Sequence, residues 1–171
     1  QMNSTVPLTF LSTAVADTHT LGAALGALLR RGDIVLLAGD LGAGKTHLSK
    51  GIVAGTGCTD LVTSPTFVFI NEYRAPAQLT IFHVDLYRIE SSVALDSIGL
   101  ADATAGSGIC LVEWAERDPS LYEMPHLQIT IHHHTATSRL IQLSGVGSRA
   151  TTLIHALQQQ PPLTIYRGDS I

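Results

Sequence analysis

A glycine-rich stretch, GDLGAGKT at residues 39–46, has the residue types and the spacing of a phosphate-binding loop. It matches the pattern G-x-x-x-x-G-K-[ST] in full through Gly39, Gly44, Lys45 and Thr46. In such a loop the backbone N–H groups converge on a phosphate, the lysine bridges the β- and γ-phosphates, and the hydroxyl is a ligand of Mg²⁺. We therefore expect a nucleotide site with Mg²⁺. The predicted nucleotide contacts in the loop are Leu41, Gly42, Ala43, Gly44, Lys45, Thr46 and His47.

Two acidic residues, Asp85 and Glu113, each come directly after an apolar run of the sequence. If both runs are parallel strands, their carboxyl ends meet at the edge where open α/β sheets bind ligands. We expect Asp85 to hold Mg²⁺ together with Thr46, and Glu113 to support the metal or to order a water. An aspartate after a strand is also a common helix cap, but the complete loop favours the metal role. The predicted catalytic residues are thus Lys45, Asp85 and Glu113.

Other residues carry less specific signals. Ser64 and Thr66 offer hydroxyls on a proline-stiffened SPTF turn, which we interpret as a switch that senses the γ-phosphate. Trp114, the only tryptophan, either packs on the core or stacks on a nucleobase, and its residue type does not decide between them. The histidines at 132–134 point to alternate faces of a strand, so we predict a polar strand edge and not a metal site. His83 is predicted to pack or to hydrogen-bond.

Three function classes are compatible with the loop and the acids: a hydrolytic switch, a small-molecule kinase, and a module that binds nucleotide without turnover. A kinase usually needs an arginine-rich lid to exclude water, and Arg139 is the only lysine or arginine between Asp118 and Arg149. A GTPase is disfavoured because no N-K-x-D segment is present. The residues therefore favour hydrolysis, and a small-molecule P-loop kinase is the alternative.

The composition is that of a globular protein. Of the 171 residues, 45% are hydrophobic and 14% are charged, which indicates one domain over residues 1–158 followed by a tail over 159–171 that we expect to be loose. The net charge of −4 argues against direct binding of free nucleic acid. Cys58 and Cys110 lack metal or disulfide spacing, and no apolar run reaches the length of a membrane span. We expect a soluble, cytoplasmic protein.

The apolar patterns predict strands and helices that place the loop and both acids at one edge of a sheet. Continuous apolar runs are typical of parallel strands that are covered on both faces, and alternating runs are typical of strands with one wetter face. We predict an α/β fold of three layers, like that of P-loop NTPases, with a mixed, largely parallel central sheet and antiparallel additions. The predicted strands are 6–11, 34–38, 68–73, 79–84, 109–112, 127–131 and 140–143. The predicted helices are 17–31, 44–57 and 149–158, and a helical stretch with a short turn around Gly99 is predicted within 91–105.

Taken together, the motifs resemble those of the bacterial TsaE family, formerly called YjeE. These are P-loop ATPases of the pathway that makes threonylcarbamoyladenosine on transfer RNA. The resemblance covers about residues 8–143, and the loop together with HVDLYR and VEWAER is highly specific. Its motifs are GDLGAGKT at 39–46, SPTF at 64–67, HVDLYR at 83–88, IGL at 98–100 and VEWAER at 112–117.

The resemblance implies a slow, Mg²⁺-dependent ATPase that binds TsaB and TsaD type proteins and supports the formation of N6-threonylcarbamoyladenosine on tRNA. The tRNA would be contacted only indirectly, through the complex. By position, Asp85 would be the Mg²⁺-linked acid, Glu113 would support metal and hydrolytic water, and Trp114 would lie against the base. Arg88 would brace the site. His47 stands where the family commonly has a small hydroxyl residue.

Overall fold

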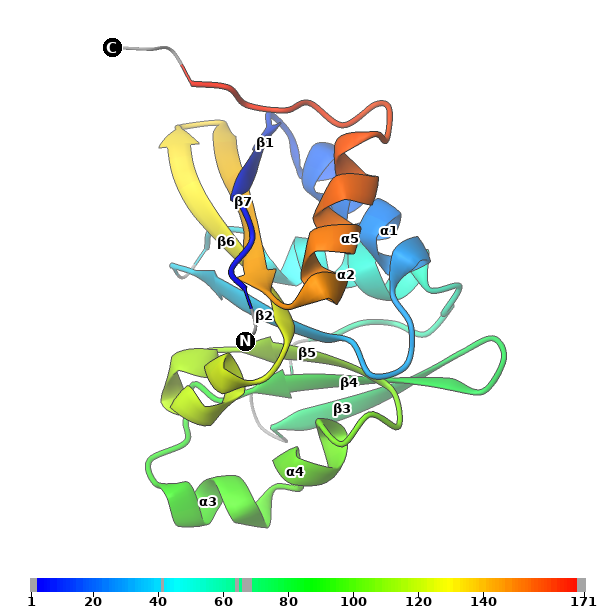
Figure 1. Ribbon diagram of the computed structural model, residues 1–171, viewed down its shortest axis with the longest axis vertical. Helices are drawn as coiled ribbons and strands as arrows, with labels where there is room; N and C mark the ends of the chain where they lie inside the picture. Colours follow the sequence, from blue (N-terminus) through cyan, green and yellow to red (C-terminus); the bar gives the residue numbers. More distant parts are fainter. Residues whose placement is uncertain (1–2, 41, 64, 66–68, 169–171) are drawn as a thin grey trace.

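A seven-stranded mixed sheet with helices on both faces forms the protein (Figure 1). The computed structural model describes residues 3–40, 42–63, 65 and 69–168. The strands are β1 (Leu8–Ser12), β2 (Ile34–Gly39), β3 (Ile70–Ala75), β4 (Leu79–Asp85), β5 (Ile109–Glu113), β6 (His126–Thr135) and β7 (Ser138–Val146). The helices are α1 (Val15–Leu28), α2 (Lys45–Gly55), α3 (Ser92–Ser97), α4 (Leu100–Ala103) and α5 (Ser148–Gln158), with 3₁₀ turns η1 (Ala115–Arg117) and η2 (Pro119–Glu123).

The strand order is β1-β7-β6-β2-β5-β4-β3. The four central strands, β6, β2, β5 and β4, run parallel, and β3, β7 and β1 are added antiparallel at the two edges. The predicted mixed sheet with antiparallel additions is therefore confirmed. All five residues of β5 are buried, as expected for a parallel strand that is covered on both faces.

The two faces of the sheet bury separate cores. On one face, α1, α2 and α5 pack over a cluster that includes Leu25, Leu48, Ile81 and Leu153. On the other face, α3, α4 and the 3₁₀ turns cover a second cluster that includes Leu36. This arrangement is the three-layer architecture that the sequence predicts. No helix among the described residues is long and apolar enough to cross a membrane.

The predicted ends of α1 are wrong. The helix begins at Val15, with Ala14 as its N-cap, and not at Asp17 or Thr18. Asp17 lies in the first turn, where its Oδ2 accepts hydrogen bonds from the N–H (2.8 Å) and the hydroxyl (2.9 Å) of Thr13. It therefore satisfies a backbone donor that lies just ahead of the N-cap residue. The helix also ends at Leu28, short of the predicted Arg31.

Helices α1 and α2 pack unusually closely because each presents glycines to the other. A Cβ atom built on Gly22 of α1 would lie 2.6 Å from the carbonyl oxygen of Leu48, and one on Gly51 of α2 would lie 2.5 Å from that of His19. Gly26 approaches the carbonyl of Ile52 even more closely. Since α2 begins at the phosphate loop, this contact fixes the loop against α1.

Gly26→Ala is expected to destabilise the protein by about 2 kcal/mol, although alanine is the better helix former. The added methyl group would collide with backbone atoms of α2, which cannot move aside as a flexible side chain can. Urea unfolding measures the change. Thr20→Ala on the exposed side of α1 is the control, and its unfolding midpoint should stay close to that of the unsubstituted protein. Equal midpoints for both variants would contradict the close contact.

Residues 163–166 of the C-terminal tail lie along β1. The N–H of Leu11 donates to the oxygen of Thr164 (2.9 Å), and the N–H of Tyr166 donates to the oxygen of Thr9 (2.8 Å). Leu163 and Ile165 pack against the core. The tail therefore extends the sheet beyond β1, which would otherwise be an edge strand.

Candidate nucleotide site

The phosphate loop joins β2 to α2, as predicted. Gly42 and Gly44 have positive φ angles of 76° and 113°, which residues with a Cβ rarely adopt. A Cβ built on either glycine would meet no described atom within 4 Å, so their backbone is open to a ligand. Thr46 and His47 are exposed in the first turn of α2, whereas Ala43 is buried. Leu41 lies outside the described residues.

Lys45 is the first residue of α2 and is largely buried. Its Nζ donates a hydrogen bond to the oxygen of Gly39 (2.6 Å) and lies 4.4 Å from the centre of the Trp114 ring. The ring of Trp114 also packs on that of Tyr87, with 4.8 Å between the ring centres. Trp114 thus contacts the lysine of the loop. Its backbone is left-handed (φ 58°), which is uncommon for a residue with a Cβ and common at functional sites.

The two predicted acids lie side by side. In the parallel pairing of β4 with β5, Asp85 is the register partner of Glu113, and each is the last residue of its strand. Their side chains lie on the same face of the sheet as that of Ile81, which belongs to the core beneath α2. The sheet therefore places both carboxyl groups on the side of the phosphate loop.

Asp85 is a buried carboxyl whose charged form is less favourable than that of a carboxyl in water. Burial raises its pKa above the ordinary value of 3.8, and the nearby Glu113 raises it further. The N–H of Tyr87, which donates to Oδ1 (2.9 Å), His83 and Lys45 act in the opposite direction. A divalent cation would stabilise the charged form of Asp85, so this carboxyl is suited to holding a metal.

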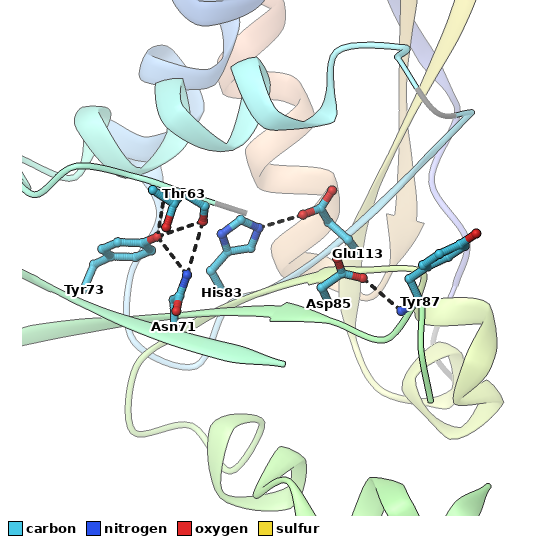
Figure 2. A network of polar contacts seen from close by, with 7 residues as sticks. All are labelled: Thr63, Asn71, Tyr73, His83, Asp85, Tyr87 and Glu113. Carbon is cyan, nitrogen blue, oxygen red and sulfur yellow. Dashed lines mark hydrogen bonds and ion pairs between the residues drawn. The ribbon is translucent and has the colours of Figure 1, made fainter. Parts of the chain in front are cut away.

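Glu113 is held by a histidine from the neighbouring strand (Figure 2). The Nε2 of His83 lies 2.9 Å from Oε2 of Glu113, and both side chains are almost fully buried. The prediction that His83 is a hydrogen-bonding residue is confirmed. The other ring nitrogen, Nδ1, is buried and has no hydrogen-bond partner within the part of the chain that the structure describes.

The donor set suits Mg²⁺. Among the described residues, no group of three or more His, Cys, Asp or Glu side chains is placed to hold a metal ion. Mg²⁺ at this edge would therefore be bound by one or two carboxylates, the Thr46 hydroxyl, phosphate oxygens and waters. Mg²⁺ is commonly held in this way, by few protein ligands together with substrate phosphates.

The segment that contains the predicted switch is anchored at both ends. Before it, the backbone N–H of Thr63 donates to the hydroxyl of Tyr73, and that hydroxyl donates to the oxygen of Thr63, both at 3.2 Å (Figure 2). After it, the N–H of Asp85 donates to the oxygen of Phe69 (2.8 Å). Ser64 and Thr66 lie outside the described residues, so their role stays a prediction.

A cavity of about 190 Å³ lies on the other side of the phosphate loop. Sequence reasoning missed it because its walls come from three distant segments and no motif links them. It also gives His47 a place in the site, since this side chain lines the cavity. The lining residues are Ser12, Ala14, Val15 and Thr18 around the start of α1, Gly42, Ala43, Gly44 and His47 of the loop, and Thr137 and Arg139 of the β6–β7 hairpin.

Other predicted residues lie at the margins. Arg88 directly follows Tyr87 and is exposed. Leu86 and Leu100 are buried in the second core, whereas Tyr87 is 42% exposed. The histidines at 132–134 lie on the exposed end of β6, which confirms a polar strand edge.

Asp85→Asn is expected to raise the stability of the nucleotide-free protein at neutral pH. A raised pKa means that the folded carboxyl keeps its proton to a higher pH than the unfolded one. The free energy of unfolding should then fall as the pH rises from 3.8 through the folded pKa, and asparagine removes this dependence. Urea unfolding over a pH series measures this dependence. The difference in the free energy of unfolding between Asp85→Asn and the unsubstituted protein should grow as the pH rises.

The exposed Asp96→Asn is the control for this comparison, and its stability should follow the unsubstituted protein at every pH. If Asp85→Asn is no more stable than the unsubstituted protein at neutral pH, burial does not make the charged form of Asp85 unfavourable, and the assignment is contradicted.

The comparisons with known proteins agree on one family. The family model described as "Threonylcarbamoyl adenosine biosynthesis protein TsaE" matches residues 12–141. The "tRNA threonylcarbamoyladenosine biosynthesis protein TsaE" of Bacillus subtilis (strain 168) is 37% identical over 143 residues, which cover 84% of this chain and 89% of that protein. The protein of the same name from Treponema pallidum (strain Nichols) is 39% identical over 121 residues, covering 71% and 87%.

A solved structure is also similar. The crystal structure of YdiB from Bacillus subtilis superposes with a TM-score of 0.76 at 31% sequence identity, and the match covers 93% of this chain and 97% of that one. The fold, the order of the motifs and the sequence identity thus agree. This chain belongs to the TsaE family of threonylcarbamoyl adenosine biosynthesis proteins.

Proposed function

We propose that this chain binds ATP with Mg²⁺, hydrolyses it slowly, and supports TsaB and TsaD type proteins in forming N6-threonylcarbamoyladenosine on tRNA. The observation that carries the proposal is the convergence of Lys45, Asp85 and Glu113 at one edge of the sheet. A loop lysine beside two strand-end acids is the arrangement that phosphoryl transfer to water requires. Membership of the family supports a role in threonylcarbamoyladenosine biosynthesis, and TsaB and TsaD type proteins are the partners that the resemblance of the motifs implies. This role would place the chain in the cytoplasm.

Each residue has a defined task in this proposal. The open backbone of Gly42 and Gly44 receives phosphate oxygens, and Lys45 exchanges the Gly39 carbonyl for a phosphate oxygen as its acceptor. Asp85 and Thr46 would hold Mg²⁺, which when bound would supply positive charge near the phosphates. Glu113 orients the attacking water and accepts its proton. The ring of Trp114 packs over Nζ of Lys45 and shields it from solvent.

The nucleoside has two candidate places. The family resemblance puts the base against Trp114, which lies on the lysine side of the loop. The cavity on the opposite side of the loop is bounded by His47 and Arg139 and has room for a ring. We favour the cavity, because an extended triphosphate with its γ-phosphate near the acids would leave the loop on that side. The ring of Trp114 would then lie near the phosphates and not against the base.

Phosphate release from ATP tests the function directly. The chain is assayed alone and with a purified TsaB–TsaD pair, with no small-molecule acceptor, and co-elution is followed with and without ATP. We expect slow release alone and faster release with the pair. No stimulation together with no co-elution in ATP would overturn the partner role. Turnover that depends on an added small-molecule acceptor would instead support the kinase alternative.

A further inference from the structure

We propose that His83 is a positioning residue, which fixes the carboxylate of Glu113 in the orientation that hydrolysis needs. The inference deepens the proposed function and rests on it. His83 is the third residue from the end of β4 and is only 1% exposed, so its side chain does not reach the solvent. Among the described residues its side chain is hydrogen-bonded to Glu113, so an effect of His83 on turnover would act through this contact and through its influence on the neighbouring Asp85.

The sheet geometry brings the histidine to the acid. His83 and Asp85 are two residues apart on β4 and so share a face, and Glu113 is opposite Asp85 on β5. His83 and Glu113 are thus diagonal neighbours, a separation that long side chains span. Glu113 bends back along the sheet to reach Nε2 at 2.9 Å, away from the strand end (Figure 2).

The two acids are held by different donors. Asp85 accepts from the backbone N–H of Tyr87 (2.9 Å), whereas Glu113 accepts from the ring of His83 (2.9 Å). Because two neighbouring carboxylates repel each other, neither would keep a single orientation without its own donor. Backbone geometry fixes the first donor, but only a side chain supplies the second. The orientation of Glu113 therefore depends on residue 83.

The burial of His83 is costly unless it serves this contact. Its register partners are Leu111 on β5 and Asn71 on β3, and the ring of Tyr73 lies 6.5 Å away, centre to centre. The Nδ1 atom is buried with no hydrogen-bond partner in the described ranges, which is unfavourable for a polar atom. An apolar residue would fill this core position at lower cost, so the structure favours a role for the Nε2 contact beyond packing.

Steady-state kinetics with the TsaB–TsaD pair test the consequence for turnover. In His83→Ala we expect kcat to fall roughly tenfold or more, while KM for ATP changes less than about twofold, because the group that is lost touches only another residue of the site. His83→Gln carries an amide donor of similar reach and should recover most of kcat. An unchanged kcat in His83→Ala, or a Gln variant no better than Ala, would overturn the inference.

His126 provides the matched control. It is also a buried histidine with a ring hydrogen bond, from Nδ1 to the oxygen of Met124 (2.7 Å). However, it is the first residue of β6 and so lies at the amino end of the parallel strands, whereas the acids lie at their carboxyl ends. His126→Ala should lose stability and keep kcat. If His83→Ala and His126→Ala lose stability equally and both keep kcat, His83 is a structural residue only.

Crystal structures separate this inference from the proposed function. The unsubstituted protein should show Glu113 in one orientation, His83→Ala should show it displaced or in several, and His83→Gln should restore it. An unmoved Glu113 in His83→Ala overturns the positioning role even if ATP is hydrolysed. If Glu113 is displaced in His83→Ala but the unsubstituted protein hydrolyses no ATP with its partners, the positioning role is supported and the proposed function is overturned.

Discussion

Lys45→Ala is expected to reduce ATP turnover by roughly 10²–10³-fold and to weaken ATP binding as well. The Nζ of Lys45 is the only lysine or arginine nitrogen of the loop, and it is held within reach of the phosphates by the Gly39 carbonyl (2.6 Å) and the Trp114 ring (4.4 Å). Its positive charge is used in the ground state and in the transition state. Both KM and kcat should therefore change.

Lys50 is the matched control, because it is the only other lysine of the chain and lies on the same helix. Lys50→Ala removes the same charge one turn and a half further along α2, so it should leave ATP binding and turnover close to normal. Phosphate release and equilibrium binding of ATP measure both variants. Equal losses in the two would show that the net charge of α2 matters, and not the position of Lys45.

Glu113→Gln is expected to lower ATP turnover by roughly 10²–10⁴-fold while ATP still binds. The amide oxygen can accept the hydrogen bond from His83 Nε2, so the geometry is kept and only the charge and the proton acceptor are lost. Because a like charge beside Asp85 disappears, the pKa of Asp85 should move down toward its ordinary value.

Glu123→Gln, in the exposed part of η2, is the control for this substitution. It makes the same change of charge outside the site and should leave turnover intact. Single-turnover phosphate release and binding of ATP in Mg²⁺ distinguish chemistry from binding. Normal turnover in Glu113→Gln would exclude Glu113 as the proton acceptor. Loss of binding alone would instead assign it to the metal.

The two variants should fail in different ways. Lys45→Ala loses an interaction with the nucleotide itself, whereas Glu113→Gln loses only the step that consumes water. A complex that needs bound ATP but not its hydrolysis would therefore still form with Glu113→Gln and not with Lys45→Ala. Co-elution of each variant with the TsaB–TsaD pair in ATP compares them directly.

Much of the site was predictable because its parts are local in sequence. The loop pattern between an apolar run and a helix fixes both the backbone shape and the place of Lys45 and Thr46. Asp85 and Glu113 each end a buried run, and parallel strands leave their carboxyl ends at one edge. The structure places both acids in register there. The antiparallel pair β3–β4 was predicted for the same reason, since two strand patterns flank a short turn.

Other parts depend on contacts between distant segments, which no local pattern encodes. The start of α1 was predicted wrongly because aspartate is common both at the cap and in the first turn of a helix, and only the hydrogen bonds of Asp17 to Thr13 decide between them. The glycines of α1 and α2 look like weak helix formers until the two helices are seen in contact. Trp114 has two reasonable environments, and its contact with Lys45 depends on how β5 ends.

The sequence by itself determined the chemistry available to this protein: a phosphate loop, a threonine hydroxyl that we propose as a ligand of Mg²⁺, and two strand-end acids on an α/β framework. These follow from residue type and spacing, which act over a few residues. Only the tertiary structure decided how the groups are oriented: that His83 holds Glu113, that Lys45 lies on Trp114, and that His47 lines a cavity with Arg139. Each of these contacts joins segments that are far apart in the chain, so its geometry exists only once the sheet and helices have packed.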